Sequence, residues 1–217
     1  MNVSSRLIVL NTTKVGENSL VIHTLGPVFG RRSFITTVGK KSSMALFLPL
    51  NVLDAEIMEN PKSELWRVRN MRAVYPLTGI RNNIYKNSMT LFMSEVLFRA
   101  VKDGCDVDGL SEWCEKSVLT LDSLEGDFAN YHLRFLLEFA AVLGFSPSFE
   151  NLVPFADGCS NELRNLLTED FPRFMLYPLT GETRNAIAGS LLKYIGYHAE
   201  SSMDVRSLPV LRELYKN

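Results

Sequence analysis

This sequence lacks the residue patterns that mark most enzymes and metal proteins. Its cysteines, Cys105, Cys114 and Cys159, form no Cys-x-x-Cys pair, and its three histidines have no His-Glu-x-x-His spacing. A zinc site or a dense disulfide framework therefore lacks its ligands. No Gly-x-Ser-x-Gly nucleophile elbow occurs either. The sequence thus predicts a protein that is not an enzyme, with no small-molecule substrate, no metal and no other cofactor.

Long apolar runs are missing as well. No uninterrupted apolar segment approaches the roughly 18 residues that a membrane helix needs, and residues 1–12 hold only one arginine and one four-residue apolar run. These absences predict a cytoplasmic protein with no membrane partner. The stretch Gly39-Lys40-Lys41-Ser42 ends like a nucleotide-binding loop, but Phe34 stands where that loop needs a second glycine. We therefore expect these lysines to hold a phosphate of another kind.

The charge is distributed unevenly along the 217 residues, although the net charge is only −1. Residues 1–82 carry 11 lysines and arginines against 5 acidic residues, so the remainder is net acidic. Such a division indicates an N-terminal module that meets a polyanion and a C-terminal module that need not.

Up to residue 76 the sequence alternates β-rich runs with Gly and Pro breaks, which is typical of short strands joined by turns. Five strands in this length predict a small closed barrel of the OB type over residues 1–78. The predicted strands are Arg6–Thr13, Ser19–Leu25, Arg31–Val38, Phe47–Ile57 and Leu65–Tyr75.

After Pro76 the apolar period changes to that of helices, which predicts a helical domain over residues 79–217. The fold class is therefore α+β, with an N-terminal five-stranded OB-fold β-barrel followed by an all-α helical bundle. Asp127 is the expected N-cap of the third helix, which ends at Gly144. Residues 147–178 hold several prolines and predict an irregular connection with one short helix near 161–167. The other helices are expected over 89–101, 109–122, 182–198 and 208–216.

Basic residues cluster at three places in the predicted barrel. Residues two apart in a strand share a face, so Arg67 and Arg69 project together. Arg31 and Arg32 begin the third strand, and Lys40 and Lys41 follow it in a loop. These clusters predict a groove for a nucleic-acid backbone, although basic side chains at strand ends can also serve only to keep the edges soluble. The candidate binding residues are Arg31, Arg32, Lys40, Lys41, Arg67, Arg69, Arg72 and Lys14.

Four aromatic residues have two open interpretations. Phe29, Phe34, Trp66 and Tyr75 could offer faces on which bases stack, or they could belong to the barrel core. The sequence does not decide between the two.

Several stretches, taken in their order and spacing, resemble RecO, the bacterial recombination mediator. They are "LIVLNTTKVGENSLVIHTLGPVFGRRSFITTVGKKSSMALFLPLNVLDAEI", "SMTLFMSEVLFRAV", "GDFANYHLRFLLEFAAVLGFSP" and "VRSLPVLREL". The resemblance covers most of the chain and is weakest between residues 148 and 178. It implies an OB domain followed by a helical domain, with the family's basic OB surface matched by the arginines and lysines named above.

The resemblance also implies partners. Such proteins bind single- and double-stranded DNA without sequence preference, anneal complementary strands, and work with RecR to help RecA displace single-strand binding protein. Nucleoid association would follow from DNA binding. The acidic, hydrophobic tail of single-strand binding protein suits an apolar groove on the helical domain, with Arg134, Lys193 and Arg212 as candidate rims. Many members carry a four-cysteine zinc site after the third helix, but Cys159 alone lies there, so other packing should hold that segment.

Binding to the phosphates of a DNA backbone should depend measurably on salt concentration. About five side chains that each neutralise one phosphate predict a log–log salt slope of roughly −3.5 on single strands. The alternative is an OB-fold protein-interaction scaffold without a direct DNA role.

Overall fold

The computed structural model describes residues 2–39, 44–63 and 65–215, and it divides into two compact units. Unit 1 comprises the chain up to Thr78 together with Val101–Val118. Unit 2 comprises Gly79–Ala100 and the chain from Leu119 onward. The segment Val101–Val118 thus groups with the strands although its sequence is partly helical. The assignment of functional domains to 1–78 and 79–217 stays a prediction.

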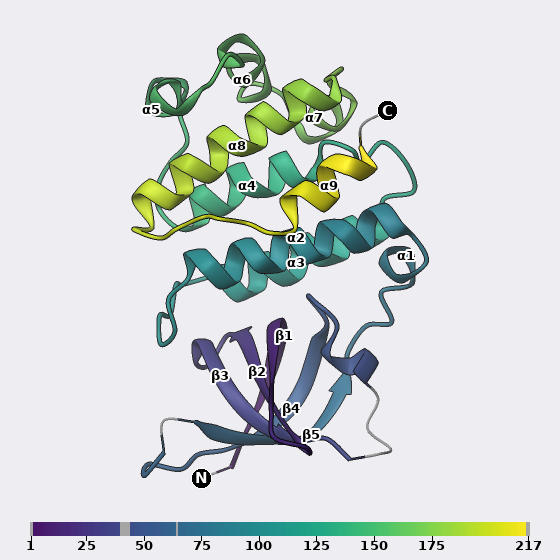
Figure 1. Cartoon of the computed structure of the whole chain (residues 1–217), viewed down its shortest axis with the longest axis vertical. Coiled ribbons are helices and arrows are strands. Elements are labelled where there is room, and N and C mark those ends of the chain that lie inside the picture. Colours follow the sequence, from purple (N-terminus) through teal and green to yellow (C-terminus); the bar gives the residue numbers. More distant parts are fainter. Residues whose placement is uncertain (1, 40–43, 64, 216–217) are drawn as a thin grey trace. The chain divides into compact units, whose positions relative to one another are not determined.

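Unit 1 contains a closed barrel with the strand order β1-β2-β3-β5-β4 (Figure 1). All neighbouring strands are antiparallel except β3 and β5, which are parallel. A closed five-stranded barrel followed by helices confirms the predicted α+β fold with an OB-type barrel. The strands are β1 (Asn2–Val15), β2 (Ser19–Gly26), β3 (Gly30–Thr37), β4 (Val52–Met58) and β5 (Trp66–Ala73).

The barrel core is formed by the inward-facing residues of the strands. Phe34 is fully buried in this core, and Phe29 and Trp66 pack against it from partly buried positions. Phe34 is thus a core residue. Because alternate residues of a strand point to opposite faces, the residues between these core positions form the outer surface of the barrel. The buried core residues are Leu7, Leu20, Ile22, Phe34, Phe47, Ala55, Ile57 and Val68.

The predicted start of the fourth strand at Phe47 is wrong. The chain forms the 3-10 helix η1 (Met44–Phe47) and then a turn in which Leu50 has a φ of 59°. Buried Asn51 closes the turn, since its Nδ2 donates to the backbone oxygens of Ala45 at 2.7 Å and Leu46 at 3.0 Å. A short apolar run does not distinguish a strand from a buried turn, which is why the sequence misplaced this boundary.

The helices follow the predicted order (Figure 1). Within unit 2, α4 packs against α8, and α2 packs against α9. Five predicted helices, over 89–101, 109–122, 161–167, 182–198 and 208–216, are confirmed apart from their ends, and residue 216 of the last one lies outside the described residues. The helices are α1 (Thr78–Arg81), α2 (Ile84–Ala100), α3 (Leu110–Ser123), α4 (Tyr131–Val142), α5 (Phe149–Leu152), η2 (Val153–Phe155), α6 (Ser160–Leu166), α7 (Phe171–Leu176), α8 (Gly181–His198) and α9 (Leu208–Leu214).

Two helical predictions are wrong in detail. Asp127 has a φ of 51° and is not an N-cap, because α4 begins at Tyr131 after Asn130. Residues 147–178 also contain more helix than predicted, since α5, η2 and α7 flank α6. Prolines stand in the first turns of η2 and α7. At that position a proline starts a helix instead of breaking one, because the missing N–H has no helical partner there.

Asn130 joins the ends of three helices in unit 2. Its side chain is buried, and Nδ2 donates to the backbone oxygens of Phe174 at 3.1 Å, Met175 at 3.3 Å and Tyr177 at 2.9 Å. These oxygens lie at the end of α7, where carbonyls lack helical partners. Asn130 Oδ1 accepts from Arg184 Nε of α8 at 2.9 Å. This amide therefore supplies part of the packing that holds the segment before α8.

Replacement of Asn130 by alanine should lower the free energy of unfolding by about 3 kcal/mol, because several buried polar groups lose their partners at once. Asn165→Ala is the matched control. Asn165 is exposed and donates one side-chain hydrogen bond to Tyr177 Oη, so its loss should cost less than about 1 kcal/mol. Urea denaturation of both variants measures the difference, and equal losses would contradict the role given to Asn130.

His132 is buried in α4 and stands edge-on to Phe92, with ring centroids 5.9 Å apart. Burial, followed by the positive charge of Arg184, lowers the pKa of His132 to about 3. Its ordinary pKa in an unfolded chain is about 6.5. The unfolded state therefore takes up a proton first as the pH falls, and the stability that His132 contributes above pH 6.5 is lost toward pH 3.

Between pH 6 and 4.5 the wild type should lose about 1.4 kcal/mol of unfolding free energy per pH unit more than His132→Phe. Phenylalanine keeps the aromatic packing but does not titrate. Urea denaturation over this pH range gives the two slopes. Parallel slopes would show that His132 is protonated equally in the folded and unfolded states.

Candidate nucleic-acid interface

Three arginines of β5 lie in one column on the outer face of the barrel. Arg67 and Arg69 are exposed on either side of buried Val68, as a two-residue period requires. A register irregularity follows, with Asn70 at a φ of 51° as the extra residue. Such a bulge shifts the alternation by one, which turns Arg72 to the outer face. We call Arg67, Arg69 and Arg72 the arginine column.

Each arginine of the column faces one residue of β4. Arg67 pairs in register with Met58, Arg69 with Glu56, and Arg72 with Asp54. Strand β1 lies on the far side of β4 and places Arg6 beside Asp54. Two rows of this surface therefore hold a carboxylate, and the row of Arg67 holds a thioether instead.

The two carboxylates form ion pairs with the column. Arg69 Nε lies 3.1 Å from Glu56 Oε2, and Arg72 Nη2 lies 3.1 Å from Asp54 Oδ2. The arginine side chains are 51% and 80% exposed, and both carboxylate side chains are about 40% exposed. Ion pairs this exposed contribute only about 0.2–1 kcal/mol each. Within the described ranges no carboxylate pairs with exposed Arg67.

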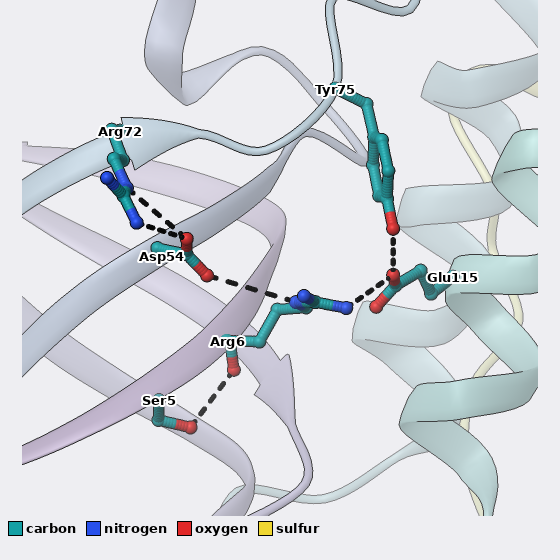
Figure 2. Close-up of polar contacts among 6 residues, drawn as sticks. All are labelled: Ser5, Arg6, Asp54, Arg72, Tyr75 and Glu115. Carbon is teal, nitrogen blue, oxygen red and sulfur yellow. Dashed lines mark hydrogen bonds and ion pairs between the residues drawn. The ribbon is translucent and has the colours of Figure 1, made fainter.

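Figure 2 shows how the row of Arg72 continues into a polar network. Asp54 also lies 3.9 Å from Arg6 Nε, and Arg6 Nη1 lies 2.8 Å from Glu115 Oε1. Tyr75 Oη donates to the same Glu115 oxygen at 2.7 Å, which raises the pKa of the Tyr75 phenol. The side chain of Glu115 is only 17% exposed, so Arg6 and Tyr75 have a fixed partner. Arg72 reaches only the outer end of this network.

Arg31 and Arg32 point to opposite faces of β3, because they are adjacent in a strand. Arg31 is 6% exposed and its Nη1 lies 2.8 Å from Asp103 Oδ2. Arg32 instead lies over the Trp66 ring, with its guanidinium carbon 3.6 Å from the ring centroid. The two arginines that the sequence grouped together are therefore separated by the structure, and Arg31 does not expose its charge.

The segment around Asp103 covers the beginning of β3. Gly30 has a φ of 57°, and a Cβ built there would lie 2.3 Å from the backbone oxygen of Cys105. Arg31 donates its backbone N–H to that oxygen at 2.9 Å. Ser33 Oγ donates to Asp103 Oδ2 at 2.6 Å. The segment thus contacts the beginning of β3 up to Ser33, and Ile35, the next residue on the same face, pairs with Arg67 of the column.

The remaining candidates are lysines. Lys14 is exposed near the end of β1, opposite Leu20 of β2. Leu20 in turn pairs with Thr36, so Lys14 lies at the end of the sheet where β3 finishes. Lys40 and Lys41 fall outside the described residues, and Gly39 is the last described position before them.

Two open hollows flank the arginine column. One is lined by Arg67, by the apolar residues Ile35, Met58 and Leu65, and by the polar residues Glu59, Asn60 and Ser63. The other lies along β1, β4 and β5 on the outer face. Its lining includes Ser4, Arg6, Asp54, Glu56, Asn70 and Arg72. The column therefore borders one partly apolar and one charged depression.

Asp54 and Glu56 are the site residues that the sequence interpretation missed. Their two-residue spacing, which places both on one face of a strand, was the signal that could have found them. Their pairing with Arg69 and Arg72 depends on the bulge, because these arginines are three residues apart. Asp103 had no such signal, since it lies 72 residues beyond its partner Arg31.

Neither a membrane span nor a metal cluster is found in the part of the chain that the structure describes. No helix there combines the length and apolar character needed to cross a bilayer. In the same ranges no three side chains of His, Cys, Asp or Glu gather in a way that could hold a metal ion.

Comparison with known proteins gives one consistent result. No protein-family model matches the chain. The chain is 26% identical to the DNA repair protein RecO of Phocaeicola vulgatus, over 96% of this chain and 97% of that protein. It is 25% identical to RecO of Flavobacterium psychrophilum and 22% identical to RecO of Azobacteroides pseudotrichonymphae, in each case over 99% of this chain and 100% of the relative. Similarity along nearly the whole chain to several proteins of one name supports a RecO-type protein.

Proposed function

We propose that this RecO-type protein acts in DNA repair by binding the backbone of single- and double-stranded DNA without sequence preference and annealing complementary strands. With RecR it would help load RecA onto single strands coated by single-strand binding protein. The names of its relatives support a DNA repair protein. The observation that carries the binding step is the arginine column on the outer face of the OB-type barrel.

The column suits a phosphate backbone in chemistry and spacing. Residues two apart in a strand are separated by about 6.6 Å, so consecutive arginines can meet successive phosphates along an extended strand. The planar guanidinium donates two parallel hydrogen bonds to a phosphate. Because Arg67 has no carboxylate partner among the described residues, it is the member whose charge is most available to a phosphate.

The same geometry explains why the binding would ignore sequence. Contacts to phosphates position a nucleic acid but do not distinguish its bases. By covering charge on two strands at once, the protein would lower the repulsion that keeps them apart, and base pairing would then drive annealing. The hollow beside Arg67, although Glu59 also lines it, offers the apolar side chains of Ile35, Met58 and Leu65 as contacts for a base.

The contact set is smaller than the basic residues of the sequence indicate. Arg31 is omitted, because its side chain is buried against Asp103. Arg32 is a secondary candidate, since its guanidinium already covers one face of Trp66. Lys14 lies on the barrel surface, and Lys40 and Lys41 remain candidates from the sequence alone. The set therefore centres on the arginine column.

Two of the three rims proposed for the tail of single-strand binding protein already form ion pairs. Arg134 forms an i,i+4 ion pair with Glu138, and Lys193 pairs with Asp157. Both charges thus already have intramolecular partners. The docking of that tail on the helical unit, and the binding of RecR, rest on the family resemblance.

Arg67→Gln should weaken binding to a single-stranded 30-mer about fivefold to tenfold at 50 mM NaCl and make the salt slope shallower by roughly 0.7, the contribution of one phosphate contact. Fluorescence anisotropy over 50–300 mM NaCl measures both. Arg173→Gln is the matched control, because Arg173 is exposed in α7 of unit 2. An unchanged slope for Arg67→Gln would remove Arg67 from the interface.

Charge reversal at Lys40, Lys41, Arg67 and Arg69 separates a DNA mediator from a protein scaffold. We expect the variant to lose annealing of complementary oligonucleotides, because four favourable phosphate contacts become repulsive. Annealing is followed by fluorescence quenching, with and without RecR and single-strand binding protein. If annealing persists, or if only partner binding is lost, the scaffold interpretation is favoured.

A further inference from the structure

The carboxylates of β4 occupy the guanidinium groups that the proposed function assigns to phosphates. Arg72 Nε and Nη2 both donate to Asp54 Oδ2, at 3.3 Å and 3.1 Å. Arg69 Nε donates to Glu56 Oε2 at 3.1 Å. The Nε edge of a guanidinium is one of the edges that can present two parallel N–H groups to an oxyanion. A phosphate that binds these arginines at this edge must first displace a carboxylate.

The register makes this competition regular along the surface. Asp54 and Glu56 are two residues apart and share the outer face of β4, and each meets one arginine of the column. Arg69 and Arg72 are three residues apart, whereas Glu56 and Asp54 are two residues apart. The extra residue at the bulge, Asn70, therefore brings Arg72 opposite Asp54. Only the row of Arg67 departs from the pattern, because Met58 stands at the corresponding position of β4.

We infer that Asp54 and Glu56 compete with DNA phosphates for Arg69 and Arg72. Because each carboxylate can take its arginine back, a strand bound to these two arginines is easily released. This inference rests on the proposed DNA binding. Both ion pairs are substantially exposed, so a phosphate can displace either carboxylate at small cost. The displaced carboxylate then stays close to the phosphate and repels it.

Competition also changes the salt dependence. A guanidinium that binds phosphate releases a cation condensed on the DNA, which steepens the slope. Salt also screens the ion pair between the arginine and its carboxylate, so that breaking this pair costs less as the salt concentration rises, which offsets part of the effect. The wild type should therefore show a shallower slope than three arginines alone would give, with Arg67 as the main contributor.

The experiment compares the full-length wild type with Asp54→Asn/Glu56→Gln, which keeps side-chain size and removes both charges. We expect the variant to bind a single-stranded 30-mer about 4- to 25-fold more tightly at 50 mM NaCl, or twofold to fivefold for each carboxylate. The salt slope should become steeper by up to about 1.4. Dissociation measured by competitor chase should slow by a similar factor.

Glu17→Gln is the matched control for net charge. Glu17 is exposed in the turn between β1 and β2, and its loss changes the charge of the barrel by the same amount as Glu56→Gln. It should tighten binding less than Glu56→Gln and leave the slope unchanged. Equal effects of the two substitutions would mean that Glu56 acts only through net charge, which would overturn the inference.

A double-mutant cycle tests whether Glu56 changes DNA affinity through Arg69. In an Arg69→Gln background, Glu56→Gln should add no more than Glu17→Gln does, because the arginine for which the carboxylate competes is gone. A full gain in that background would contradict competition. Thermal unfolding of each variant verifies the fold, and a loss of stability without a gain in affinity would make the pairs structural only.

The inference and the proposed function fail in different ways. If the wild type does not bind DNA, or if Arg67→Gln leaves binding unchanged, the proposed interface is lost. If Arg67→Gln weakens binding while Asp54→Asn/Glu56→Gln leaves both affinity and slope as they were, the interface stands and the competition is refuted.

Discussion

The surface of this barrel depends on the strict alternation of side chains in β5 and on the one residue that interrupts it. Without the irregularity at Asn70, a two-residue period would point Met71 outward and Arg72 into the barrel. The extra residue keeps Met71 against the apolar core and Arg72 in line with Arg67 and Arg69. The place of Arg72 in the column and its pairing with Asp54 follow from this single shift in register.

The basic and acidic parts of the sequence are not fully separated in the fold. The segment Val101–Val118 belongs to the acidic part of the chain, yet it groups with the barrel and supplies Asp103 and Glu115. With this segment included, unit 1 has 12 lysines and arginines against 10 acidic residues. The barrel is therefore not a uniformly positive body. Its capacity to bind a polyanion depends on where the arginines stand and which carboxylates face them.

Local rules predicted most of the fold and part of the site. The number of strands, the shared face of Arg67 and Arg69, and most helices follow from side-chain periodicity. Alternation also places Arg31 and Arg32 on opposite faces, so their grouping went against a rule the sequence already contained. The burial of Arg31 could not be predicted, because Asp103 reaches it across a long loop closure. The role of Asn130 depends likewise on carbonyls more than 40 residues away.

The arginines of this barrel fall into two groups, which the burial of the guanidinium distinguishes. The Arg31 side chain is only 7% exposed, so breaking its ion pair with Asp103 costs more than breaking a fully exposed pair. Arg69 and Arg72 form pairs in water, where exchanging a carboxylate for a phosphate costs little. In the proposed function this difference matters, because a protein that brings two strands together must also let go of the duplex. A column of weakly held arginines meets both requirements, whereas a column of unopposed arginines would bind more tightly and release more slowly.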